Sequence, residues 1–293
     1  MNRNHQIDRR LASNHYGLHL RRGFTLLELL VVISIIGALM SLIASAIVSA
    51  REQSRRVQCM NRLRQVALAL HGFHSAHRKL PEGNLPGRLW TFQSQLLAYV
   101  DRVDLADRID LSFPDYCFFY GQSVPPDQDP RPISLESFAC PADPNAGLVC
   151  STYEATHGRH ATNSYLGVSG TSPVAHDGLL FSGSRVRLDA VRDGTSNTLM
   201  IGERGIPDDL EAGWLLCAGG ELPDYSGNRD NLLSTERSLV TTSGPDNGYF
   251  WSHHRDVVQF AFADGSVTGL NPSIDHILLQ SLSTRSGSEL ISF

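Results

Sequence analysis

The pattern of hydrophobic and polar positions changes sharply within the first 80 residues. Residues 29–50 form a run without a charged side chain, broken only by one glycine and four serines. About 20 apolar residues cross a bilayer as a helix, so this run is long enough to span a membrane. Beyond it the chain is polar, and apolar or aromatic side chains recur every three or four residues at Cys59, Leu63, Val66, Leu70, Phe73 and His77.

This second pattern predicts one buried stripe of an amphipathic helix. Because no helix breaker precedes Pro81, we expect one continuous helix over residues 24–78, about 80 Å long. Its first half would lie in lipid or in a filament core, and its second half would pack on a globular domain. The three histidines at 71, 74 and 77 lie too far around the helix to share one ion, so we expect no metal site there.

Residues 81–293 have short apolar runs separated by Gly, Pro, Asn and Asp, which indicates strands and loops. Alternation over 257–263, a turn at 263–266 and a return over 267–270 predict a hairpin. We expect two further strands, over 162–168 and 198–201, and a helix over 90–103. The predicted fold class is α+β, with a long N-terminal helix packed on an antiparallel, loop-rich sheet.

Charge divides the chain further. Residues 1–23 contain five arginines and one aspartate, although the whole chain has a net charge of −5. Arginine on this side of the apolar run predicts that the N-terminus stays in the cytoplasm. We therefore expect a basic leader (1–23), a transmembrane or assembly half of the helix (24–50), an amphipathic half (51–80) and an exported globular domain (81–293).

This organisation predicts a single-pass protein of the cytoplasmic (inner) membrane, with its C-terminal domain in the periplasm or the extracellular space. The negative net charge gives no reason to expect nucleic-acid binding. A secretory signal peptide has a shorter apolar region, and neither it nor a plain signal anchor explains Glu28 at the start of the apolar run. A carboxylate at bilayer depth is costly unless it is paired, which makes Glu28 a functional residue by hypothesis.

The segment Arg22-Gly23-Phe24-Thr25-Leu26-Leu27-Glu28 resembles the N-terminus of type IV prepilins and pseudopilins. The resemblance implies that a prepilin peptidase cuts after Gly23 and methylates the new terminus at Phe24. It also implies that Glu28 pairs with the terminal amine of a neighbouring pilin-like subunit, which is reasonable because buried charges are tolerated as pairs. The expected partners are the peptidase, other pilin-like subunits and the lipid bilayer.

Five cysteines in a chain of this length do not make a disulfide scaffold. Cys140 and Cys150 are the favoured pair for a structural disulfide in an oxidising compartment. Cys117 or Cys217 is the alternative partner, since connectivity cannot be deduced from sequence. In this interpretation Cys59 is left unpaired on the helix.

The sequence contains two Asp-Gly turns that are candidates for a metal or catalytic site. Asp193-Gly194 precedes Asn197, and this oxygen-rich turn offers too few ligands for Ca²⁺, so we expect a satisfied polar turn without metal. His254 precedes Asp264-Gly265 by ten positions across the predicted strand. The two ends would lie about 30 Å apart at 3.3 Å per residue, so they cannot form a catalytic dyad and indicate a fold signature.

Together with Cys-Pro-x-Asp, Asn-Ser-Tyr, Asp-Gly-Thr-Ser-Asn-Thr and Ala-Asp-Gly-Ser-Val strings, these features resemble one bacterial family. It joins a prepilin-type segment to a domain of unknown function with a C-terminal His-X9-Asp-Gly motif. The resemblance implies a pseudopilin-like fold and an export-associated surface protein. It supplies no catalytic residue and no cofactor.

The first function hypothesis is a non-enzymatic pilin-like or pseudopilin-like subunit of a secretion or surface structure. The alternative is a membrane-anchored envelope module that binds a small solute, a sugar or calcium. An exported hydrolase is disfavoured, because the sequence has no Gly-x-Ser-x-Gly, His-Glu-x-x-His or Walker motif.

Overall fold

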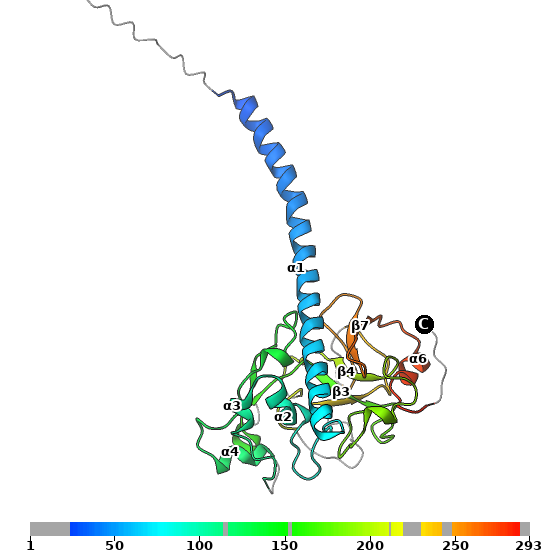
Figure 1. Cartoon of the computed structure of the whole chain (residues 1–293). Helices are drawn as coiled ribbons and strands as arrows, with labels where there is room; N and C mark the ends of the chain where they lie inside the picture. The colour runs from blue at the N-terminus through cyan, green and yellow to red at the C-terminus, as the bar shows by residue number, and fades with distance from the viewer. Residues whose placement is uncertain are drawn as a thin grey trace, which may run out of the picture. The chain divides into compact units, whose positions relative to one another are not determined.

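The computed structural model describes residues 24–113, 117–151, 154–210, 212–218, 230–241 and 248–287. The chain divides into two compact units, Met1–Ser49 and Ala50–Phe293. Helix α1, Leu26–His77, contributes to both (Figure 1). The predicted long helix is thereby confirmed. The chain leaves the helix at Arg78, which adopts a left-handed backbone with φ of 61°.

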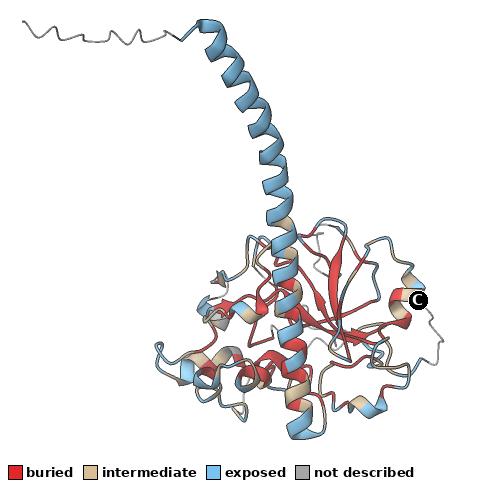
Figure 2. Cartoon of the chain, turned by 45° about the horizontal axis from the view of Figure 1, so that its top comes forward, coloured by how far each residue is buried: buried red, intermediate tan, exposed pale blue. Residues whose placement is uncertain are grey.

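The stripe predicted on the second half of α1 is confirmed at five of six positions. Cys59, Leu63, Val66, Leu70 and Phe73 are buried. His77 is exposed instead, with its ring 4.1 Å from the ring of Phe73. Figure 2 shows this change along α1, from exposed residues to buried ones where the helix contacts the sheet of its own unit.

The larger sheet has five strands in the order β5–β3–β4–β6–β7. Their bounds are Leu232–Ser234 (β5), Tyr165–Gly170 (β3), Leu199–Glu203 (β4), Val258–Phe262 (β6) and Val267–Leu270 (β7). The predicted hairpin is present as β6 and β7, and the pairs β3·β4, β4·β6 and β6·β7 are antiparallel. Strand β5 runs parallel to β3, so the sheet is mixed rather than purely antiparallel. The α+β class is confirmed.

The alternation along β6 separates two cores. Ala261, with Ala263 just beyond the strand, belongs to the buried cluster that contains Cys59 and Leu63 of α1. Phe260 and its neighbours Val258 and Phe262 face a second cluster, which is closed by Leu279 and Leu282 at α6, His276–Ser281. The face of β6 towards α1 carries Ala261 and Gln259, whose amide donates to the Arg56 carbonyl of α1 at 3.3 Å, while phenylalanines fill the opposite face.

The remaining elements are short. The segment expected to form one helix over 90–103 is divided into three pieces, and Asp101, which has a left-handed backbone with φ of 58°, separates the second piece from the third. The pieces are α2 Phe92–Leu96, the 3₁₀ turn η1 Leu97–Tyr99 and α3 Val103–Ala106. The others are η2 Cys117–Phe119, α4 Tyr120–Ser123, η3 Glu136–Phe138, α5 Glu154–His157 and η4 Leu188–Ala190, with β1 Val149–Cys150 and β2 His160–Ala161 as a two-stranded sheet.

Candidate functional site

The start of α1 is fixed by a reciprocal pair of hydrogen bonds. The Thr25 hydroxyl accepts from the Glu28 backbone N–H at 3.2 Å, and the Glu28 carboxylate accepts from the Thr25 N–H at 2.8 Å. This is a capping box, which satisfies two of the unpaired donors at a helix N-terminus. Glu28 therefore also caps the helix. This role was not predicted, although Thr-x-x-Glu is the sequence pattern of a capping box. Gly23 lies outside the described residues, and Phe24 is exposed.

The apolar unit buries none of its described side chains. Every residue from 24 to 49 is exposed, including the leucines, isoleucines and valines of α1. α1 contains a stretch long and apolar enough to cross a membrane. Such a surface needs lipid or other helices to cover it.

A disulfide joins the second half of α1 to the globular part. Cys59 on α1 is bonded to Cys140, and Cys117 is bonded to Cys217. The expected Cys140–Cys150 disulfide is therefore wrong, and Cys150 is a buried free thiol. The loop that carries Cys140 is held against the helix, because Arg62 of α1 donates to the Ala139 carbonyl at 2.7 Å.

Cys150 lies elsewhere, on strand β1. There it is in register with His160 of β2 in the small sheet. The sequence could not reveal this, because the two correct pairings close loops of 81 and 100 residues rather than ten.

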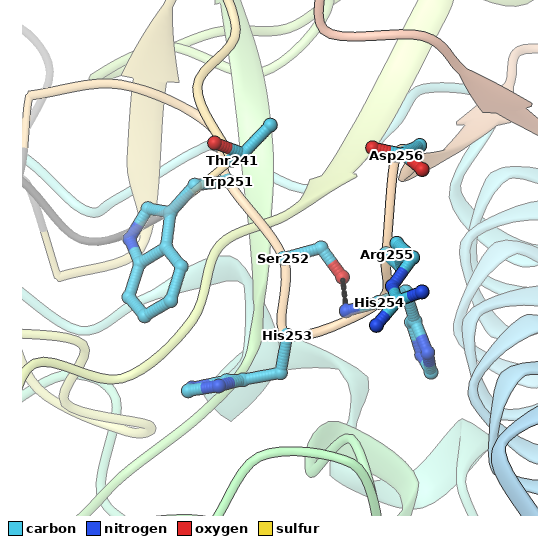
Figure 3. Close-up of a pocket in the computed structure, with 7 residues that line it drawn as sticks. All are labelled: Thr241, Trp251, Ser252, His253, His254, Arg255 and Asp256. Carbon is cyan, nitrogen blue, oxygen red and sulfur yellow. Dashed lines mark hydrogen bonds between the residues drawn. The ribbon is translucent and has the colours of Figure 1, made fainter.

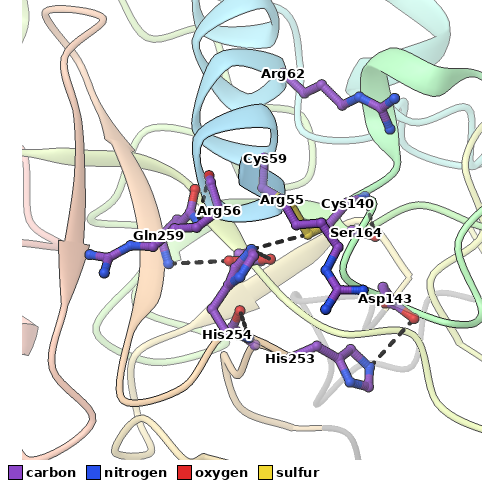
Figure 4. Close-up of polar contacts among 12 residues, drawn as sticks. Arg55, Arg56, Cys59, Arg62, Cys140, Asp143, Ser164, His253, His254 and Gln259 are labelled. Carbon is purple, nitrogen blue, oxygen red and sulfur yellow. Dashed lines mark hydrogen bonds and ion pairs between the residues drawn. A yellow bond between two sulfur atoms is a disulfide. The ribbon is translucent and has the colours of Figure 1, made fainter. Parts of the chain in front are cut away.

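The sequence motifs meet around the Cys59–Cys140 disulfide (Figure 4). The Ser164 hydroxyl accepts from the Cys140 N–H at 3.1 Å, and the Tyr165 hydroxyl donates to the Cys59 carbonyl at 3.1 Å. Asp143 of the Cys-Pro-x-Asp string accepts from the Ile206 N–H at 2.7 Å. Strings far apart in the sequence therefore build one buried structure beside α1.

His254 occupies the centre of this structure. Its Nδ1 lies 2.9 Å from the carboxylate of Glu52, on α1, and its Nε2 lies 3.4 Å from Sγ of Cys140. Nε2 is also 3.8 Å from the carboxylate of Glu203, at the end of β4. Since a carboxylate accepts and does not donate, the contact with Glu52 assigns the ring proton to Nδ1. The bare Nε2 then faces Cys140 and Glu203.

Burial sets the protonation states of these three side chains. Desolvation raises the pKa of Glu203 to about 8, against smaller effects of hydrogen bonds from Ser252 and the Gln259 N–H. Desolvation also lowers the pKa of His254, although Glu52 opposes this shift. Partial burial would raise the pKa of Glu52, but hydrogen bonds from His254 and Arg55 outweigh it and leave that pKa below its usual value. Near neutral pH the set is an ionised Glu52, a neutral His254 and a neutral Glu203.

A hollow of about 450 Å³ opens beside His254 (Figure 3). Its lining residues are Thr241, Trp251, Ser252, His253, His254, Arg255 and Asp256. The Ser252 hydroxyl accepts from the His254 N–H at 3.0 Å and fixes the backbone at the rim. His253, which is partly exposed, points instead towards Asp143 at 3.4 Å.

The two Asp-Gly turns come together at the other end of β6. The Asp264 N–H donates to the Thr195 carbonyl at 3.0 Å, next to the Asp193-Gly194 turn. Gly265 and Gly194 both need a left-handed backbone, with φ of 86° and 95°. A Cβ on Gly265 would lie 3.5 Å from the imidazole of His71 on α1.

The motif therefore lies along the helix. Its His254 end contacts Glu52 and its Gly265 end lies against His71. These α1 positions are 19 residues apart, about 28 Å at 1.5 Å per residue. His254 and Asp264 therefore contact different parts of the protein.

The Asp193 turn is engaged within the protein. Its carboxylate accepts from the Thr284 hydroxyl at 3.0 Å and from the Gly287 N–H at 2.6 Å. The Asn197 side-chain amide donates to the Asp193 carbonyl at 3.1 Å. This arrangement ties the C-terminal segment to the sheet and is the geometry of a hydrogen-bonded structural turn.

Within the described residues, one group of side chains has the composition of a metal centre. Cys59, Cys140, Glu203 and His254 are all buried, and their donor atoms lie within 4.8 Å of one another. Two of the donors are the bonded sulfurs of the disulfide.

The apolar helix and its capped start define the class of the N-terminal unit. Residues 18–44 match the prokaryotic N-terminal methylation motif, so the chain has a type IV pilin-like N-terminus, and together with the apolar helix this indicates a single-pass membrane anchor. Residues 48–276 match the family described as a protein of unknown function (DUF1559). The match covers more than three quarters of the chain, which therefore belongs to that family. No curated protein and no solved structure matches the chain.

Proposed function

We propose that the protein is a non-enzymatic type IV pilin-like or pseudopilin-like subunit of a secretion or surface structure. A prepilin peptidase removes the leader after Gly23 and methylates Phe24. The subunit is held in the cytoplasmic membrane by α1, with the leader in the cytoplasm and the globular unit on the outer side. The observation that carries this proposal is the methylation motif leading into an exposed apolar helix.

Glu28 is the assembly residue in this proposal. In the single chain its carboxylate is held by Thr25. After cleavage the terminal amine of a neighbouring Phe24 offers it a positive charge, and in an apolar helix bundle a carboxylate needs such a partner. A purely local role as a helix cap is the competing explanation, and the two roles make different predictions.

The non-enzymatic assignment is supported by how the motif residues are engaged. His254 and Asp264, the acid–base types that a hydrolase would need together, contact different neighbours, Glu52 of α1 and Thr195 respectively. The Asp193 turn is occupied by hydrogen bonds to the C-terminal segment.

Mass spectrometry of the chain purified from native membranes tests the processing step. The expected product begins at Phe24 and carries one additional methyl group at its terminus. A chain that retains Met1, or that is cut near Ala50, would exclude pilin-type processing.

A pair of variants separates the two roles of Glu28. Glu28→Gln keeps an oxygen that can accept from Thr25 but removes the charge, whereas Thr25→Val removes half of the capping box and keeps the charge. We expect Glu28→Gln to be processed normally and to lose cross-linking between differently tagged copies by tenfold or more. Thr25→Val should cross-link like the wild type. Equal losses in both variants would reduce Glu28 to a helix cap.

A second candidate function is a membrane-anchored module for a small solute, a sugar or calcium. The hollow beside His254, with Trp251, His253 and Arg255 on its lining, favours it. Binding to the folded state raises the melting temperature by linkage. A shift with a sugar, a peptide or a divalent ion on the disulfide-bonded protein would support this function, and unchanged melting with all three would count against it.

A further inference from the structure

The Cys59–Cys140 disulfide lies against a histidine nitrogen and a carboxylate that the pilin-like function does not use. All four side chains are buried, and their donor atoms fall within 4.8 Å of one another. A structural disulfide needs neither an imidazole nor a carboxylate at its sulfurs. We propose that reduction of this disulfide opens a tetrahedral Zn²⁺ site formed by Cys59, Cys140, His254 and Glu203.

The present distances already fit part of such a site. With Zn–S near 2.3 Å and Zn–N near 2.0 Å, the edges of the tetrahedron are about 3.3–3.8 Å. His254 Nε2 lies 3.4 Å from Sγ of Cys140 and 3.8 Å from Oε1 of Glu203. The nitrogen–sulfur edge, about 3.5 Å in such a site, is therefore in place, while the nitrogen–oxygen edge must shorten by about 0.5 Å, which a rotation of the Glu203 side chain can supply. Opening the covalent bond lets the sulfurs separate to the third edge, about 3.7 Å.

Glu52 supplies the support that metal-bound histidines normally have. The ligating nitrogen of a zinc histidine is oriented by a carboxylate or carbonyl at the other ring nitrogen. Glu52 holds Nδ1 of His254 at 2.9 Å in this way. This contact places the ring proton on Nδ1 and leaves the lone pair of Nε2 directed at Cys140 and Glu203. A metal ion at Nε2 requires this tautomer.

The hollow beside His254 borders the proposed site, with His254 as the one proposed ligand on its lining. His254 itself is 3% exposed, but it lies on the lining of the 450 Å³ hollow. Cys59 and Cys140 belong to the hydrophobic core that contains Leu63 and Tyr165, so an ion entering beside His254 reaches the sulfurs at the edge of that core.

The redox step balances with a dithiol as reductant. The dithiol is oxidised to its own disulfide and transfers two electrons and two protons, which gives the Cys59 and Cys140 thiols. Zn²⁺ then displaces both thiol protons and the proton of the Glu203 carboxyl, because thiolate and carboxylate are the ligating forms. Two thiolates, one imidazole and one carboxylate in a tetrahedron select Zn²⁺ over harder ions such as Ca²⁺ or Mg²⁺.

The test uses the full chain in detergent with Cys117, Cys150 and Cys217 changed to alanine, so that only the proposed pair remains. The protein is reduced with a phosphine, which does not compete for the ion as a dithiol would, and is titrated with Co²⁺ as a spectroscopic substitute for Zn²⁺. We expect one equivalent to bind, with the charge-transfer and d–d absorption of a tetrahedral thiolate site. Zn²⁺ should displace it.

Three variants in this background define the ligand set. His254→Ala should weaken Co²⁺ binding by tenfold or more, and Glu203→Gln should change the visible spectrum. Glu52→Gln should weaken binding about 10- to 100-fold, as expected for a residue that orients a ligand. The matched control is Glu136→Gln, because Glu136 is an acid with a 94% exposed side chain beside the same loop, and it should bind like the parent.

Three results would overturn the proposal. They are equal Co²⁺ binding by the disulfide-bonded and reduced proteins, undiminished binding by reduced His254→Ala, and a reduced parent that binds no ion. If the triple-alanine background does not fold, the same titrations are made on the reduced wild type and its His254→Ala variant. The difference between those two proteins then decides the question.

Discussion

Residues 24–49 expose every side chain that they carry, mostly leucine, isoleucine, valine and alanine, whereas the unit that begins at Ala50 buries a glutamate and a histidine. The first segment carries its signal in a short contiguous string, Gly23 to Glu28, within the matched methylation motif. The second brings its polar groups together from α1, β4 and the segment before β6. A linear motif can be recognised in the unfolded chain, while the buried cluster exists only after the globular unit has folded.

This difference predicts that a substitution in one region leaves the other region unaffected. The largest effect is expected on leader removal, from a substitution at Gly23. Replacing Gly23 with a bulky residue such as phenylalanine should abolish leader removal, because the side chain would obstruct the peptidase at the cleaved bond. Intact-mass measurement should show the full 293-residue chain. The melting temperature of the globular unit should not change, and a lower value would show that the regions depend on each other.

The second largest effect is expected from the disulfides. The pairs close loops of 81 and 100 residues, for which the loop-entropy model gives about 4–5 kcal/mol each and measurements usually give about 2–5 kcal/mol. Cys59→Ala/Cys140→Ala and Cys117→Ala/Cys217→Ala should therefore lower the free energy of unfolding by similar amounts. Denaturant titration measures both. Peptidase cleavage should remain normal in each variant, and its loss would contradict the separation of the two regions.

Helix α1 and strands β3, β4, β6 and β7 were predictable, because periodicity is a local property of the sequence. The period of two along β6 even separates Ala261 from Phe260, on opposite faces of the sheet. The cluster at the disulfide was not predictable. His254 and Glu52 are 202 residues apart, and Glu52 lies in a polar stretch of α1 with no distinguishing pattern.

Glu203 was missed for a related reason. It is the last residue of the apolar strand β4, where an acid usually marks the exposed end of the element, but here it is buried and its carboxylate lies within 4.8 Å of the Cys59 sulfur on α1. The parallel pairing of β5 also lay beyond sequence reasoning, because a three-residue strand leaves no periodic signal.

The buried carboxyl of Glu203 makes the stability of the globular unit depend on pH. The titratable groups that interact with it include Asp143, Glu52, His254 and Tyr165. Its pKa is about 8 in the folded protein against 4.5 normally, so between these values the folded state holds a proton that the unfolded chain releases. The resulting stabilisation is complete below about pH 4.5 and is lost as the pH rises through about 8.

In the disulfide-bonded protein, raising the pH from 5 to 8 should therefore lower the free energy of unfolding by on the order of a few kcal/mol through this group. Glu203→Gln cannot release the proton and should lack this part of the slope. Urea unfolding of both proteins at several pH values measures the difference. Parallel slopes would mean that Glu203 ionises in the folded state at an ordinary pH.

The smallest expected change in the free energy of unfolding comes from removing, one at a time, the contacts that hold the Cys140 loop on α1. Arg62 donates to the Ala139 carbonyl at 2.7 Å and lies 3.4 Å from Glu136, whose side chain is 94% exposed. A hydrogen bond from a charged donor to a partly buried carbonyl stabilises by about 1 kcal/mol or more, while an exposed ion pair adds about 0.5 kcal/mol or less. Arg62→Ala should therefore cost about 1 kcal/mol and Glu136→Ala almost nothing. Arg64→Ala, at an exposed position two residues away, controls for the change in helix propensity. A loss with Glu136→Ala as large as that with Arg62→Ala would mean that the ion pair, and not the backbone contact, positions Cys140 against the helix.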